Sequence, residues 1–162
     1  MSTSEANTAF TRATSNVFSI PPGHRQRAIV SSAPQRSWRD GVNAQMTALI
    51  RLEVGWDGYF ANPVTLENAT FAFRMMEACC PDNAPEPHIA PGPNGDLQLE
   101  WHTTNVKIEL HVREPNDVLA WHADAATGPN GTELSLTTDF TEVEKWILSL
   151  VRSGGAAATA AA

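Results

Sequence analysis

The stretch LQLEWHTTNVKIELHVREPNDVLAWHAD, residues 97–124, alternates apolar with polar side chains in three runs. The runs span 97–102, 106–113 and 118–124. A period of two is typical of strands that bury one face. Pro115-Asn116 marks the turn between the second and third runs. The stretch therefore predicts three antiparallel strands.

The register of these strands can be predicted from the apolar positions. We expect Trp101 to lie opposite Val106 and Val112 opposite Leu119, because a slip of one residue would move apolar side chains off the buried face. The solvent-facing side then carries two predicted cross-strand rows, Glu100–Lys107–Asp124 and Gln98–Glu109–His122. Four tryptophans fall on predicted apolar faces and are expected in the core: Trp38, Trp101, Trp121 and Trp146.

Helical spacing appears on both sides of this stretch. Apolar positions predict a first helix over residues 37–54, ending before Gly55, and a second after Pro63 that Pro81 stops. A last helix is expected over residues 140–151, capped by Asp139 or Thr138. The second helix is apolar on two sides, which predicts a central position.

Two further segments can extend the sheet. His88-Ile89-Ala90 lies in a proline-rich connector and can add an edge strand, and Asn94-Gly95 is a hairpin turn signal. Residues 133–136 suggest a short fourth strand. The sequence thus predicts an α+β fold: two N-terminal helices, a three- to four-stranded antiparallel meander and a closing helix, in a two-layer sandwich. We expect a flexible arm at 1–34, one domain at 35–152 and a disordered Ala-rich tail at 153–162.

The net charge of −7 is unevenly distributed. Residues 1–40 carry five arginines and two acids, whereas the remaining 122 residues carry six basic and sixteen acidic side chains. An acidic body repels phosphate backbones and attracts basic surfaces. We therefore expect a protein with a basic surface as partner, and no nucleic acid bound by the folded part.

The cellular compartment is predicted from the N-terminal residues and the cysteines. Residues 1–16 show no charged segment followed by an apolar run, and no stretch of about 18 apolar residues occurs. Cys79 and Cys80 are adjacent, which argues against a disulfide between them and for a reducing compartment. These features predict a cytoplasmic protein without a membrane span.

The sequence GWDGYFANP, residues 55–63, joins the first two helices. The glycines, Asn62 and Pro63 are typical of a corner, with Asp57 bonding turn amides. Trp56 is interpreted as the lid of the core, with a partner contact as the alternative. Tyr59 and Phe60 belong to residue types found at binding hot spots, and whether they point outward is left open.

The sequence contains few residues in patterns typical of catalytic or metal-binding sites. Histidines and carboxylates gather on the predicted polar sheet face, and His102, His111 and His122 are weak candidates for metal ligands. Their spacing matches no recognised metal motif, and no nucleophile elbow, P-loop or dinucleotide fingerprint is present. The two cysteines end a buried helix, where an apolar environment would keep a thiol inert. We predict no catalytic residue, no metal and no cofactor.

Two motifs resemble those of a known group of proteins. GWDGYFANP and PHIAPGPNGDLQLEW follow the patterns G-W-D-G-x-x-A-x-P and P-x-I-x-P-x-x-x-G-x-L-Q-L-E-W, and the alternating strand KIELHV comes after them. Residues 49–112 in this order resemble small uncharacterised bacterial proteins associated with mobile elements, phage-like or defence-type gene neighbourhoods. That group has no assigned activity. The resemblance implies that the corner residues define the family, and it favours a partner-binding role.

The expected function is that of a non-enzymatic interaction module, such as an inhibitor, antitoxin or immunity-like protein. One alternative is a structural subunit of a homo-oligomer or larger complex, using the edge near His88. A second is a metal-dependent enzyme on the Glu/His sheet face. The candidate partner-binding residues are Trp56, Asp57, Tyr59, Phe60, Glu100, Glu109 and Asp124.

Overall fold

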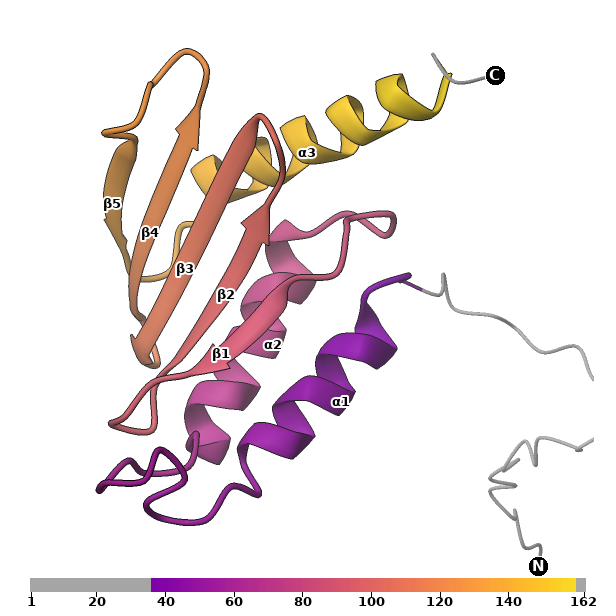
Figure 1. The fold of residues 1–162 in the computed structure, drawn as a ribbon. Coiled ribbons are helices and arrows are strands. Elements are labelled where there is room, and N and C mark those ends of the chain that lie inside the picture. Colours follow the sequence, from indigo (N-terminus) through magenta and orange to yellow (C-terminus); the bar gives the residue numbers. More distant parts are fainter. Residues whose placement is uncertain (1–35, 160–162) are drawn as a thin grey trace, which may run out of the picture. The chain divides into compact units, whose positions relative to one another are not determined.

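Three helices and five strands make up the described part of the chain (Figure 1). The computed structural model describes residues 36–159, with side chains as far as Arg152. The elements are α1 (Arg39–Leu49), α2 (Leu66–Cys79), β1 (His88–Pro91), β2 (Leu97–His102), β3 (Val106–Glu114), β4 (Asp117–Asp124), β5 (Thr132–Leu136) and α3 (Thr141–Thr159). The predicted arm at 1–34 and residues 160–162 of the predicted tail lie outside the described residues.

The strands form one antiparallel sheet in the order β1-β2-β3-β4-β5. The helices pack on one face of it, which gives two layers (Figure 1). The predicted α+β class is confirmed. The sheet has five strands rather than three or four, because both β1 and β5 are paired.

Helix α1 is shorter than predicted. It ends at Leu49, where the chain tightens into turns: the Arg51 amide donates to the Ala48 carbonyl and the Leu52 amide to the Leu49 carbonyl. Gly55 does adopt a positive φ of 82°, but it belongs to the following corner rather than to the helix end.

Helix α2 is central, as predicted. Thr65 caps its first turn by accepting a hydrogen bond from the Asn68 amide. The buried side chains lie on one face of the helix, flanked by the half-buried Phe71 and Phe73, and the helix contacts α1, α3 and β3. It ends at Cys79, before Pro81. Cys79 and Cys80 are buried free thiols, and the hydrogen bond between them together with burial raises the pKa of Cys80 far above its usual range. Neither thiol is suited to nucleophilic chemistry.

The β2–β3 register differs from the prediction by two residues. Trp101 lies opposite Ile108 and Leu99 opposite Leu110, because Thr103 and Val106 close a tight turn with three mutual hydrogen bonds. A shift of two keeps every side chain on its predicted face. The buried apolar set of both strands is therefore as expected.

The β3–β4 register is wrong by one residue beyond the turn. Glu114 lies opposite Asp117, as the predicted register requires, but a bulge between Val112 and Glu114 places Val112 opposite Val118. A one-residue shift moves every later side chain of β4 to the other face.

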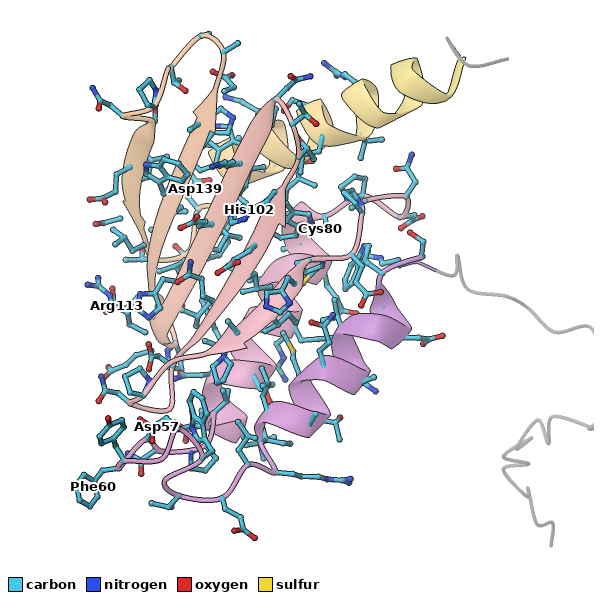
Figure 2. The ribbon with its side chains drawn as sticks, in the orientation of Figure 1. Asp57, Phe60, Cys80, His102, Arg113 and Asp139 are labelled. Carbon is cyan, nitrogen blue, oxygen red and sulfur yellow. The ribbon has the colours of Figure 1, made fainter. Side chains whose placement is uncertain are left out.

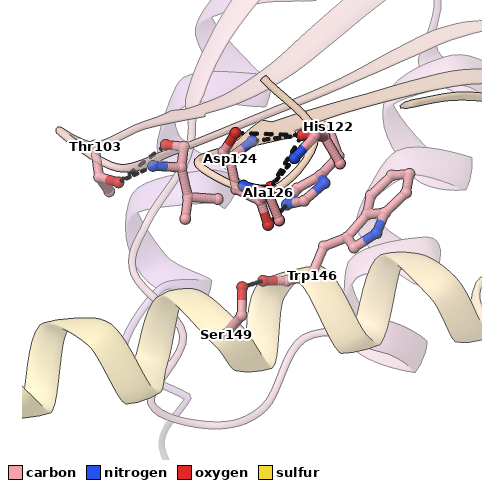
Figure 3. Close-up of polar contacts among 8 residues, drawn as sticks. Thr103, His122, Asp124, Ala126, Trp146 and Ser149 are labelled. Atoms are coloured by element: carbon pink, nitrogen blue, oxygen red, sulfur yellow. Dashed lines mark hydrogen bonds and ion pairs between the residues drawn. The ribbon is translucent and has the colours of Figure 1, made fainter. Parts of the chain in front are cut away.

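This shift exchanges the predicted positions of two neighbours. Trp121 lies on the outer face of the sheet rather than in the core, and His122 is buried at 6% exposure rather than solvent-facing. The imidazole stacks on Trp146 of α3 (Figure 3). The predicted rows through Asp124 and His122 are therefore wrong.

Helix α3 begins as predicted and runs further. The Asp139 carboxylate accepts hydrogen bonds from the amide and hydroxyl of Thr141, which lower the Asp139 pKa. The helix continues to Thr159, into the segment predicted as a disordered tail. Among the described residues, none of the three helices combines the length and apolar character needed to cross a bilayer.

Candidate functional site

The outer face of the sheet carries a row of acidic side chains. Glu100 lies directly opposite Glu109, Glu109 opposite Trp121, and Trp121 opposite Glu133. We call these four residues the acidic row. No described helix covers this face (Figure 1). Like charges directly opposite each other are unfavourable in a sheet, so this row favours a cationic neighbour.

Glu109 is held between two side chains of β2. Its Oε1 lies 3.0 Å from His102 Nε2, and its Oε2 accepts a hydrogen bond of 3.2 Å from Gln98 Nε2. No hydrogen bond or ion pair from the described residues engages the carboxylates of Glu100 and Glu133. Two of the three carboxylates in the row are thus available to a partner.

An Asp–His pair with a buried carboxylate and a half-buried imidazole lies next to the row. Asp96 Oδ2 is 2.5 Å from His111 Nε2, and Oδ1 accepts a hydrogen bond from the Asn94 amide. Burial opposes ionisation of Asp96, but the bonds from His111 and Asn94 outweigh it and lower the Asp96 pKa. Gly92 leaves the space that this carboxylate occupies, since a Cβ there would lie 2.1 Å from Asp96 Oδ2. The pair fixes the His111 ring on the outer face.

An open hollow of about 340 Å³ lies over the outer face of β2, β3, β4 and β5. It is lined by Gln98, Glu109, His111, Leu119, Trp121 and Glu133. The indole N–H of Trp121 points to the Asn130 carbonyl at 3.4 Å, and Gly131 packs against the same ring edge. The hollow is large enough to accept a side chain.

The corner, residues 55–61, is held by its own hydrogen bonds. The Asp57 carboxylate accepts from the amides of Tyr59 at 2.9 Å and Ala61 at 3.2 Å, and the Gly55 amide donates to the Ala61 carbonyl at 2.8 Å. The prediction that Asp57 bonds turn amides is confirmed.

The end of the corner and the start of α2 are anchored to the β1–β2 turn. The Asn62 amide donates to the Pro93 carbonyl and the Thr65 amide to the Gly95 carbonyl, and Asn68 Nδ2 donates to the same Gly95 oxygen. The corner is therefore fixed to the end of the sheet, where Figure 2 shows Asp57 and Phe60.

The corner aromatics face solvent. Tyr59 is 80% and Phe60 90% exposed, and Figure 2 shows Phe60 directed away from the ribbon. Trp56 is 36% exposed and donates its indole N–H to the Asn62 carbonyl, so its interpretation as a core lid is wrong. The small side chain of Ala61 is buried at this corner instead.

The other predicted site residues are distributed over both sides of the sheet. Asp124 is directed away from the acidic row: it closes the turn after β4, and hydrogen bonds from the amide and hydroxyl of Thr127 lower its pKa. His122 lies on the opposite side of the sheet from His102 and His111. Within residues 36–159, no group of three His, Cys, Asp or Glu side chains is placed to hold a metal ion.

Sequence reasoning missed Asp96, Trp121 and Glu133 as members of this surface. Trp121 and Glu133 depend on the β3 bulge, for which the sequence carries no clear signal. Asp96 follows the Asn94-Gly95 turn directly, and a carboxylate after such a turn was the available indication.

The comparisons with known proteins return no family model, no curated protein and no solved structure that matches the chain.

Proposed function

We propose that this chain is a non-enzymatic interaction module that binds the basic surface of a larger protein. The observation that carries the proposal is the corner, where Tyr59 and Phe60 are presented to solvent by a hydrogen-bonded backbone. Aromatic side chains on a pre-ordered loop lose little conformational entropy on binding. They are also among the residue types enriched at binding hot spots or interface cores.

The charge of the partner is inferred from the acidic row. Glu100 and Glu133 lack an internal partner among the described residues, and the net charge of the whole chain is −7. Complementary basic groups would relieve the repulsion between Glu100 and Glu109 and would accelerate encounter. The proposed role is that of an inhibitor, antitoxin or immunity-like protein.

The test is affinity capture from an extract of the encoding organism, followed by measurement of the affinity for the captured protein. We expect Tyr59→Ser/Phe60→Ser to weaken binding by about thirtyfold, since hot-spot truncations cost about 2 kcal/mol or more. Leu66→Ser, which removes another exposed apolar side chain, serves as the matched control and should bind normally.

The acidic row is tested on the same complex. Glu100→Gln/Glu133→Gln should lower the association rate and its dependence on salt, while Glu67→Gln/Glu144→Gln, two exposed acids on helices, should change both less. A captured partner with an acidic contact surface would contradict the proposal. So would a partner that binds the corner variant and the Glu100→Gln/Glu133→Gln variant as tightly as the unaltered chain.

A further inference from the structure

The β1 edge of the sheet is closed by a side chain of α1. Gln45 Oε1 accepts a hydrogen bond of 3.0 Å from the Ile89 amide, and Gln45 Nε2 donates to the Pro87 carbonyl at 3.1 Å. An amide side chain in this position takes the donor and the acceptor that a neighbouring strand would use. Pro91, at the end of β1, offers no amide at all. The edge near His88 is thus unsuited to strand addition.

The β5 edge is open. Among the described residues, β5 pairs with β4 and no hydrogen bond reaches it from the other side, where Figure 1 shows no further element. Its five residues, TELSL, contain neither proline nor lysine, and Glu133 is the one charged side chain on this edge. An unprotected edge is a template for another strand.

We propose that β5 pairs antiparallel with β5 of a second copy of this chain, which joins two sheets into one of ten strands. The sequence is complementary to itself in one register: Leu134 lies opposite Leu134 of the copy, Glu133 opposite Ser135, and Thr132 opposite Leu136. This register pairs all five residues and places no like charges opposite each other. It also keeps the helices of both copies on the same face.

Neighbouring registers are less favourable. Centring the pair on Glu133 would place two carboxylates opposite each other, which is unfavourable. Centring it on Ser135 would leave Thr132 and Glu133 outside the five-residue match. In the chosen register Leu134 and Leu136, which are half-buried and pack against the core, gain apolar neighbours from the copy.

The contact is small, and its size sets the affinity. Stable interfaces bury at least about 1,200 Å², which a five-residue edge does not reach by itself. We therefore expect a concentration-dependent dimer rather than an obligate one. This dimer shares Glu133 of the acidic row with the heterologous partner proposed above, but it uses neither the corner nor Glu100 and Glu109, so the corner variant distinguishes the two proposals.

The experiment is sedimentation equilibrium of the full chain up to about 1 mM, a range that detects association of about 4 kcal/mol. Unaltered protein should approach twice the monomer mass. Ser135→Glu faces Glu133 of the copy at two symmetric positions and should raise the dissociation constant by about 2- to 30-fold, whereas Ser135→Lys should lower it by a comparable factor. Thr70→Glu and Thr70→Lys make the same charge changes on the exposed side of α2 and should have much smaller effects.

A cross-link tests the register directly. An equimolar mixture of Glu133→Cys and Ser135→Cys proteins should form the mixed disulfide in preference to either self-linked species. A chain that stays monomeric throughout the concentration range would overturn the proposal, and so would Ser135→Glu and Ser135→Lys shifting the equilibrium in the same direction. Loss of the heterologous partner in the corner variant with an unchanged dimer would separate the two proposals.

Discussion

The imidazole of His122 stacks on the indole of Trp146, with ring centroids 4.9 Å apart and planes inclined by 12° (Figure 3). The pair joins β4 to α3, and the His122 side chain is buried. The nearest carboxylate oxygen, Asp124 Oδ2, lies 3.8 Å from its Nε2, which is beyond hydrogen-bond distance. A histidine in this position acts as an aromatic core residue.

Shortening His122 should therefore destabilise the fold. His122→Ala removes the ring from a buried position and should lower the free energy of unfolding by about 2–4 kcal/mol. His122→Phe keeps a stacked ring and should cost less than about 1.5 kcal/mol. Urea unfolding followed by circular dichroism measures both, and equal losses in the two variants would show that the imidazole nitrogens matter more than the stack.

Asp96 should make stability depend on pH in the acid range. Its folded pKa is lower than the ordinary value of 3.8, so its contribution is complete above that value and is lost as the pH falls through the folded pKa. Asp96→Asn should be less stable than the unaltered protein at pH 7, and the difference should shrink on acidification. Urea unfolding of both proteins between about pH 7 and pH 2.5 measures this. A constant difference would contradict it.

Substitution of Gly92 should destabilise the fold, because the Asp96 carboxylate occupies the space where a side chain would lie. The Cβ of Gly92→Ala would fall within about 2.3 Å of all three carboxyl atoms of Asp96. That carboxylate is buried, so we expect a loss of about 1–3 kcal/mol. In an Asp96→Ala background the same substitution should cost much less. A double-mutant cycle measures the coupling, which would be near zero if backbone conformation alone required the glycine.

Gln45 should protect the amide of Ile89. Gln45→Ala removes the hydrogen bonds to Ile89 and Pro87 and should cost about 1–2 kcal/mol, with the loss concentrated at β1. Hydrogen exchange of the Ile89 amide should accelerate more than that of amides in β3. Uniform acceleration across the sheet would point to a global rather than a local effect.

The corner aromatics should contribute little to folding. Tyr59→Ser/Phe60→Ser removes side chains that are 80% and 90% exposed, so the free energy of unfolding should change by no more than about 0.5 kcal/mol. Trp38→Ala, at a fully buried aromatic position, should cost about 3–5 kcal/mol. Thermal unfolding of the two variants compares them. A large loss in the corner variant would mean that these side chains serve the fold rather than a partner.

Most of the fold can be predicted from periodicity, but which residues of β4 face the core cannot. The alternation in β2 and β3 identifies their buried residues even though the register is off by two, because the faces repeat every two residues. The bulge between Val112 and Glu114 breaks this rule for β4. Both Trp121 and His122 fit a buried position by size, so the sequence does not show which of them faces the core.

The candidate site was predicted in part, for a related reason. Local turn chemistry identifies the corner and the role of Asp57, since the residues involved are close in sequence. The Asp96–His111 pair joins residues fifteen positions apart, and its prediction requires the correct β2–β3 register. The interpretation of Trp56 as a core lid is wrong because its indole N–H bonds the Asn62 carbonyl at the surface, while Ala61 is the buried side chain of the corner.

The hydrogen bonds of Gln45 also limit how far assembly can proceed. A sheet with two open edges can accept a neighbour on each side and grow without end, as head-to-tail contacts do in filaments. A sheet with one edge sealed by its own helix can accept one neighbour, and a two-fold contact between two such edges leaves none exposed. Edge pairing in this protein therefore terminates at two copies, and the side chain that determines this lies on the edge opposite to the contact.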